Sequence, residues 1–154
     1  MSITVTIEIN REFDVPASPD TVYELLADVP RSVSHFPKVE KLEPLGDNRY
    51  RWVMNKVGVD KHALQTIYAC EYRMDPTHRR IEWVPVKNEG NGVVRGHWEI
   101  TPAGGGTHIA FHTVAELTVN APAVLKLAIS PVIRHEFNAL VDTYTRNLKK
   151  TWSA

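Results

Sequence analysis

Polar side chains at positions that should face the protein interior are the first candidates for chemistry. Arg11 falls in the odd-numbered, otherwise apolar series of residues 3–15. His62, Thr66 and Thr113 alternate with apolar residues in the same way farther along the chain. Burying a polar group costs free energy unless the group is paired. These side chains could therefore orient the polar head group of a ligand.

The same positions also permit an enzymatic interpretation. Arg11 could stabilise an enolate, and His62 or the nearby Tyr68 could move protons. A β-bulge before Arg11 would instead turn its side chain to solvent, so both orientations stay open. No histidine and aspartate stand at a spacing that indicates a catalytic triad, although triad partners need not be close in sequence. The sequence therefore assigns no catalytic residue.

Large aromatic side chains are the second group of candidates. The chain has four Trp, five Tyr and four Phe residues. Many alternate along predicted strands on the side that should face inward, together with one methionine: Trp52, Met54, Tyr68, Trp83, Trp98 and Phe111. Small-molecule pockets are typically apolar with aromatic walls, and flat rings can stack on a planar ligand. An ordinary core would use the same residues, because large rings also fill space.

Metal and nucleotide sites are not expected. His97 and His112 should lie opposite each other on an outward face, but two imidazoles alone make a poor metal site. Cys70 is the only cysteine, which rules out an internal disulfide and makes a cysteine-based zinc site implausible. The glycine run at residues 104–106 lacks the following helix of a phosphate loop. We therefore predict neither a metal nor another cofactor.

The elements that must position these residues can be read from periodicity and turn signals. Strict alternation predicts a strand over residues 3–15. Ser18 and Pro19 indicate the start of a helix, and Pro30 separates it from a short second helix over residues 31–35. Six further strands are expected near residues 39–45, 49–57, 62–73, 80–87, 93–101 and 108–119. The last two should form a hairpin in which Trp98 faces Phe111.

The chain should end in an amphipathic helix. Asn120 is predicted to cap it, and Pro131 to break or kink it. The following apolar residues recur at helical spacing: Phe137, Leu140, Val141, Tyr144 and Leu148. The apolar segment 121–133, which includes Leu127, could be a lid, a transient membrane or protein contact, or simply the packed first half of the helix.

Length and charge restrict the class of protein. The 154 residues suit one domain spanning 1–154. Because 18 basic residues balance 18 acidic ones, the electrostatic argument for nucleic-acid binding is missing. The N-terminus lacks signal-peptide character, and no run is apolar and long enough to span a bilayer. We therefore expect a cytoplasmic protein that does not bind nucleic acid.

Two stretches carry a resemblance to a known family. They are FDVPASPDTVYELLADVPRSVSHFPKVEKLE near the start and PVIRHEFNALVDTYTRNLKK near the end. The chain resembles the START-like, helix-grip superfamily (SRPBCC), in its polyketide cyclase/dehydrase and coenzyme-Q-binding-protein-like branch. The resemblance implies an α+β helix-grip fold. In this fold a curved antiparallel sheet of about seven strands wraps around a long C-terminal helix, with two short helices between strands 1 and 2.

The resemblance further implies a cavity between sheet and helix for a lipid, quinone, polyketide-like or other hydrophobic molecule. We predict a non-enzymatic carrier or binding protein. One alternative is an aromatase/cyclase or dehydratase that uses the same cavity, and another is a protein-interaction module. The predicted ligand-binding residues are Arg11, Trp52, Met54, His62, Thr66, Tyr68, Trp83, Trp98, Phe111, Thr113, Leu127, Phe137, Leu140, Val141 and Tyr144. The oligomeric state stays open.

Overall fold

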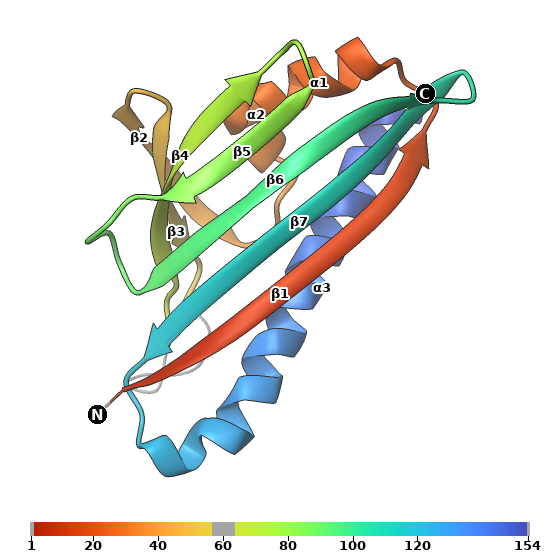
Figure 1. Cartoon of the computed structure of the whole chain (residues 1–154). Helices are drawn as coiled ribbons and strands as arrows, with labels where there is room; N and C mark the ends of the chain where they lie inside the picture. Colours follow the sequence, from red (N-terminus) through yellow and green to blue (C-terminus); the bar gives the residue numbers. More distant parts are fainter. Residues whose placement is uncertain (1, 57–63, 154) are drawn as a thin grey trace.

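A curved antiparallel sheet and a long helix across its concave side make up the architecture (Figure 1). The computed structural model describes residues 2–56 and 64–153. The sheet has seven strands in the order β1-β7-β6-β5-β4-β3-β2. The α+β helix-grip fold predicted from the sequence is therefore confirmed, including the two short helices between the first two strands.

The strands and helices follow one another without a second sheet in the described residues. Their bounds are β1 (Ile3–Val15), α1 (Pro19–Ala27), α2 (Val29–Val33), β2 (Val39–Gly46), β3 (Arg49–Met54), β4 (Ile67–Asp75), β5 (Arg80–Pro85), β6 (Gly92–Ala103), β7 (Gly106–Val119), the 3₁₀ helix η2 (Ala123–Leu125) and α3 (Lys126–Trp152). Within the described part of the chain, no helix combines the length and the apolar character needed to cross a bilayer.

The first and last strands pair along their whole length. The register runs from Ile3 opposite Val119 to Val15 opposite Thr107, with no bulge between. The odd-numbered residues of β1 are accordingly buried, as the alternation predicted, except for the half-buried Arg11. Because the register is unbroken, Arg11 stays in the inward series instead of turning outward.

The hairpin of β6 and β7 also has the predicted register. Trp98 lies opposite Phe111, and Ile100 lies opposite Ile109. All four side chains are buried. Alternation alone was therefore enough to predict which residues of β6 and β7 face inward.

The start of β4 differs from the predicted strand over residues 62–73. The described strand begins at Ile67, and residues 57–63 lie outside the described part of the chain. The side chain of Asn91 holds the backbone just before β4: it accepts from the Ile67 amide at 2.9 Å and donates to the Gln65 carbonyl at 3.1 Å. Thr66 therefore lies next to the strand and not in it.

The predicted helix start at Ser18 and Pro19 is confirmed, because α1 begins at Pro19 with Ser18 as its N-cap. Two other predicted helix boundaries near proline were wrong. α2 begins at Val29, where the Asp28 carboxylate accepts from the Arg31 amide at 3.3 Å, so Pro30 sits in the first turn. The missing amide of proline costs nothing there, since first-turn amides lack helical partners anyway. Asn120 caps no helix, because η2 begins after Pro122 and α3 only at Lys126. Pro131 lies inside α3 without ending it.

Candidate ligand-binding cavity

An inner cavity lies between the concave face of the sheet and α3, with α1, α2 and the residues after them closing one side. Its volume is about 50 Å³. The sheet contributes Trp52, Tyr68, Cys70, Tyr72, Ile81, Trp83, Val94, Trp98, Phe111 and Thr113. The helical segments contribute Leu26, Val29, Ser32, Val33, Phe36, Phe137, Val141 and Tyr144.

Aromatic rings form a connected layer around this cavity. Trp52 stacks on Tyr68 with ring centres 5.4 Å apart. Trp98 lies against Phe111 at 4.5 Å and edge-on to Tyr144 at 6.0 Å. Such offset and edge-on pairs stabilise beyond the area that they bury. The layer gives the cavity rigid, flat walls.

Gly96 creates the space that one of these rings occupies. A Cβ atom at this position would lie 2.7 Å from the Trp83 indole and would also collide with the backbone carbonyl of His112. Gly96 is directly opposite Trp83 in the pairing of β5 with β6. The absence of a side chain at position 96 therefore allows the indole to lie flat across β6.

Most hydroxyl groups of the cavity wall already have hydrogen-bond partners. Tyr144 and Ser32 share a hydrogen bond of 2.5 Å between their hydroxyl oxygens. The Trp52 indole donates to the Tyr72 hydroxyl at 3.1 Å. The Tyr68 hydroxyl has no protein partner among the described residues, so a ligand could satisfy its polar atom.

Burial keeps the acidic groups of the wall protonated. It raises the pKa of the Cys70 thiol to about 12. It raises the pKa of Tyr144 to about 12 as well, partly offset by the hydrogen bond with Ser32. The pKa values of Tyr68 and Tyr72 are also well above the ordinary tyrosine value, chiefly because of burial. At neutral pH these groups are protonated, so they are available as hydrogen-bond donors and do not act as bases.

A second cavity, which we call the mouth cavity, adjoins the inner one. Its volume is about 110 Å³, and Phe137 lines both cavities. Its apolar wall includes Met54, Leu64, Leu117, Val132, Ile133 and Leu140. Lys38 and Glu136 also line it and form an ion pair of 3.0 Å. Phe137 therefore lies where the inner cavity and the mouth cavity meet.

The structure places most predicted ligand-binding residues in these two cavities. Those in the inner cavity are Trp52, Tyr68, Trp83, Trp98, Phe111, Thr113, Phe137, Val141 and Tyr144. Those in the mouth cavity are Met54, Thr66, Leu140 and again Phe137. Their role in binding a ligand stays a prediction.

Of the remaining three predicted residues, two are placed elsewhere. His62 lies outside the described residues. Leu127 is 90% exposed and lines neither cavity, because the first turn of α3 extends beyond the end of the sheet (Figure 1). Arg11 also lines neither cavity. Its guanidinium donates to Asp142 and to Asn138 on α3, each at 2.8 Å.

The contribution of the short helices was missed, although the sequence contained a signal for it. Val29, Ser32, Val33 and Phe36 all line the inner cavity. Their spacing of three, four and seven residues is that of one helical face. The serine in this series made the stripe less obvious. Its hydroxyl is nevertheless buried because Tyr144 satisfies it.

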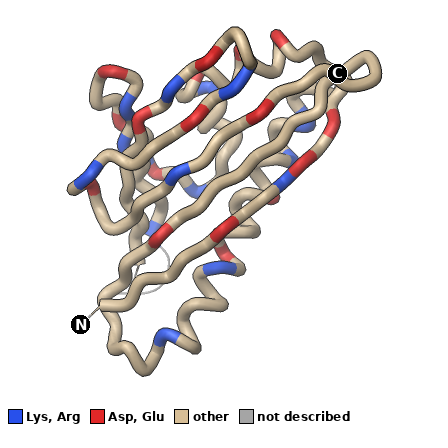
Figure 2. The backbone as a smooth tube through the Cα atoms, viewed as in Figure 1, with Lys and Arg blue, Asp and Glu red and all other residues tan. Residues whose placement is uncertain are grey.

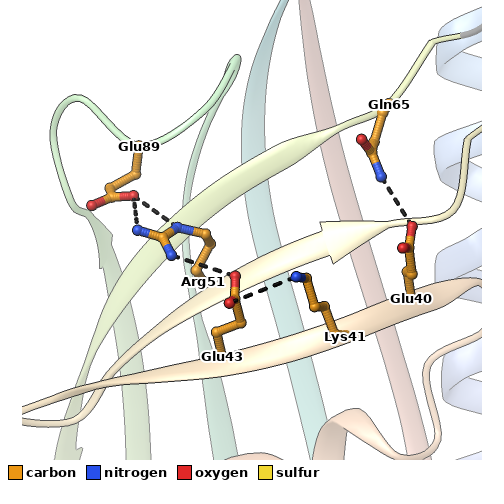
Figure 3. A network of polar contacts seen from close by, with 6 residues as sticks. All are labelled: Glu40, Lys41, Glu43, Arg51, Gln65 and Glu89. Carbon is orange, nitrogen blue, oxygen red and sulfur yellow. Dashed lines mark hydrogen bonds and ion pairs between the residues drawn. The ribbon is translucent and has the colours of Figure 1, made fainter.

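The outer face of the sheet carries a different chemistry. Figure 3 shows Arg51 between two carboxylates: it donates to Glu89 at 2.6 and 2.9 Å and to Glu43 at 3.4 Å. Lys41 lies 3.8 Å from Glu43. These contacts tie the β2–β3 hairpin to the loop before β6. Glu40 accepts from Gln65 at 3.0 Å nearby.

The two histidines predicted to face each other do so on this outer face. The rings of His97 and His112 are centred 5.5 Å apart. His112 pairs with Glu8 at 2.9 Å. Among the described residues, no group of three or more His, Cys, Asp or Glu side chains could hold a metal ion.

A concave antiparallel sheet that encloses an apolar cavity against a C-terminal helix defines the helix-grip class. The model of the family described as polyketide cyclase / dehydrase and lipid transport matches residues 6–152. The chain therefore belongs to this family, as its resemblance predicted. No curated protein sequence matches the chain significantly.

Solved structures with the same fold come from several bacteria. A protein from Thermus thermophilus is 23% identical, with a TM-score of 0.67 over 95% of this chain and 99% of its own. A START superfamily protein from Mycobacterium smegmatis is 12% identical, with a TM-score of 0.68 over 94% and 96%. The Zhui aromatase/cyclase from Streptomyces sp. R1128 is 20% identical, with a TM-score of 0.60 over 94% and 90%. At these identities the likeness concerns the fold.

Proposed function

We propose that this protein is a cytoplasmic carrier or binding protein for a hydrophobic small molecule such as a lipid, a quinone or a polyketide-like compound. One observation carries the proposal: within the described residues, the wall of the inner cavity contains no Asp, Glu, His, Lys or Arg. An acid–base enzyme needs several converging groups that titrate near the working pH. A carrier needs apolar walls and few polar anchors.

The hydroxyl groups supply those anchors. Tyr68 is buried, stacks on Trp52 and has no protein partner for its hydroxyl among the described residues. The hydroxyl is protonated at neutral pH, since burial raises its pKa above an ordinary value that already lies near 10, and as a donor it suits a carbonyl or ether oxygen of the ligand. The stacked rings suit a flat ligand body.

The size of the inner cavity requires a movement during binding. A volume of about 50 Å³ accommodates one or two water molecules, whereas ligand pockets typically have roughly 300–1,000 Å³. Phe137 lies between the inner cavity and the mouth cavity. Displacing its ring would join the two cavities, so we assign Phe137 as the gate.

A second candidate function is an aromatase/cyclase or dehydratase. The family description and the structural likeness to the Zhui aromatase/cyclase favour it. In this case the buried tyrosine hydroxyls could act only as hydrogen-bond donors or general acids toward a substrate carbonyl, given their raised pKa values. Conversion of a poly-β-keto substrate into a cyclised or dehydrated product would decide for the enzyme.

The proposal is tested by ligand binding to matched variants. Native mass spectrometry of the purified protein shows whether a molecule co-purifies, and solvent extraction identifies it. The binding of decylubiquinone, oleic acid and an anthraquinone is then measured by thermal shift and titration. Val141 lines the inner cavity and is 1% exposed, whereas Val93 lies on the outside of β6 and is 39% exposed. Val141→Phe should weaken binding at least tenfold, and Val93→Phe should not change it.

A variant with the opposite effect keeps the test independent of folding defects. Phe137→Ala removes the ring between the two cavities and should accelerate ligand entry. A protein that is always empty and whose melting temperature responds to none of the three probes contradicts the proposal. So does equal binding by the Val141→Phe and Val93→Phe variants.

A further inference from the structure

Large aliphatic side chains remain exposed where η2 meets α3. Val124 is 83%, Leu127 is 90% and Val132 is 67% exposed. Leu125, at 43%, belongs to the same stretch. Single exposed aliphatic residues are common, but a group of them marks an interaction surface. We call these four residues the apolar tip.

The apolar tip adjoins the entrance of the mouth cavity. Val132 belongs to both, and the next residue, Ile133, lines the mouth cavity from the buried side of α3. η2 and the first turns of α3 extend beyond the ends of β1 and β7 (Figure 1). The tip can therefore contact a flat surface without hindrance from the sheet.

The charge of this region selects the kind of surface. Between Glu116 and Glu136 the sequence contains Lys126 and Arg134 but no aspartate or glutamate. Figure 2 shows the same asymmetry along η2 and the start of α3. Arg134 donates to the Thr6 carbonyl at 3.1 Å. Lys126 lies between Leu125 and Leu127, two residues of the apolar tip. Exposed aliphatic residues interleaved with cations are typical of segments that lie in an anionic membrane interface.

We propose that the apolar tip docks onto a membrane that contains anionic lipids. Its aliphatic side chains would enter the headgroup region, and Lys126 would face the lipid phosphates. This orientation places the mouth cavity against the bilayer, so that a hydrophobic ligand passes between lipid and protein without crossing water. The transfer step rests on the proposed function, whereas the docking itself does not.

Vesicle flotation with the ligand-free full-length protein tests the docking. The wild type should bind vesicles of phosphatidylcholine and phosphatidylglycerol more tightly than vesicles of phosphatidylcholine alone. The double substitution Val124→Asp and Leu127→Asp should reduce vesicle affinity roughly tenfold or more, because two aliphatic insertions are lost. Lys126→Gln should reduce only the extra affinity for the anionic vesicles.

A matched control is available on the opposite part of the molecule. Leu45 lies in β2 and is 37% exposed, and Figure 1 shows β2 far from η2 and the start of α3, so Leu45→Asp should leave vesicle binding unchanged. Circular dichroism and melting temperature verify that each variant is folded.

The docking proposal is overturned if the wild type binds neither kind of vesicle, or if the double Asp variant binds like the wild type. Concentration-dependent self-association that the double Asp variant abolishes, without vesicle binding by the wild type, would assign the tip to a second copy of the chain instead. Because these measurements need no cavity ligand, their failure leaves the ligand-binding test intact.

Discussion

The two faces of β6 and β7 differ completely, although each face is only one residue away from the other. Trp98 and Phe111 face inward with ring centres 4.5 Å apart, while their neighbours His97 and His112 face outward at 5.5 Å. The inward pair is almost fully buried, and the outward pair lies among carboxylates. The strand period separates a face that stabilises the fold from a face that interacts with solvent and ions.

Truncating a side chain to alanine should lower the free energy of unfolding far more on the inner face than on the outer face. Trp98 is 3% exposed, so Trp98→Ala should lower the free energy of unfolding by about 3–5 kcal/mol. His97→Ala, one residue away on the outer face, should cost no more than about 0.5 kcal/mol. Urea unfolding monitored by circular dichroism measures both. Similar losses for the two variants would show that the inner face is not the dominant one.

Adding a methyl group at position 96 should cause the next largest loss of stability. Gly96→Ala brings a Cβ atom to 2.7 Å from the Trp83 indole and against the backbone of β7. Overpacking of this kind costs about 1–3 kcal/mol. Since the two residues are in contact, Trp83→Phe should restore part of the loss, which is a non-additive result. Strictly additive losses in thermal unfolding would contradict this contact.

The ion pair of Arg11 in β1 with Asp142 in α3 should contribute less to stability. The side chains of Arg11 and Asp142 are 30% and 51% exposed, and exposed ion pairs contribute about 0.2–1 kcal/mol. A double-mutant cycle with Arg11→Met and Asp142→Asn should give a coupling in this range. The binding of the three cavity probes should not change. Loss of binding in Arg11→Met would instead return Arg11 to the ligand site, as the sequence first suggested.

The smallest effects should come from two outer-face histidines with opposite signs. Partial burial, and then the charge of Arg80, lower the pKa of His97 below 6.5. Its contribution to stability is present above that unfolded value and is lost as the pH falls through the folded pKa. Hydrogen bonds to Asp14 and then Glu12 raise the pKa of His108 above 6.5. Its contribution is present below 6.5 and is lost as the pH rises through the folded pKa.

Melting temperatures of His97→Gln and His108→Gln between about pH 5 and about pH 8 would measure these contributions. Relative to the wild type, the His97 variant should gain stability at the acidic end, and the His108 variant should lose it there. Parallel pH profiles for the two variants would mean that the outer-face histidines share one environment.

Periodicity was enough to predict the strands, the long helix and about half of the residues that line the inner cavity. Alternation along a strand depends only on local geometry, so the facing of Trp98 toward Phe111 followed from counting residues. The family resemblance supplied the topology. The apolar stripe from Val29 to Phe36 also follows from local geometry, and its helical spacing could have been found in the sequence.

Other features depend on tertiary distances that no local pattern contains. Arg11 pairs with Asp142, which is 131 residues away in the sequence. The exposure of Leu127 depends on where the sheet ends relative to α3. The small volume of the inner cavity results from how rings of many strands pack together. These features required the complete fold.

The pairing of β1 with β7 has a consequence for how the protein folds during its synthesis. The first strand leaves the ribosome long before its partner, since Ile3 lies opposite Val119. The helix that covers the aromatic face is made after all seven strands. Domains dominated by such distant contacts fold slowly, and the uncovered apolar surface is prone to aggregation. Synthesis of this chain should therefore depend on chaperones until α3 has emerged and closed the structure.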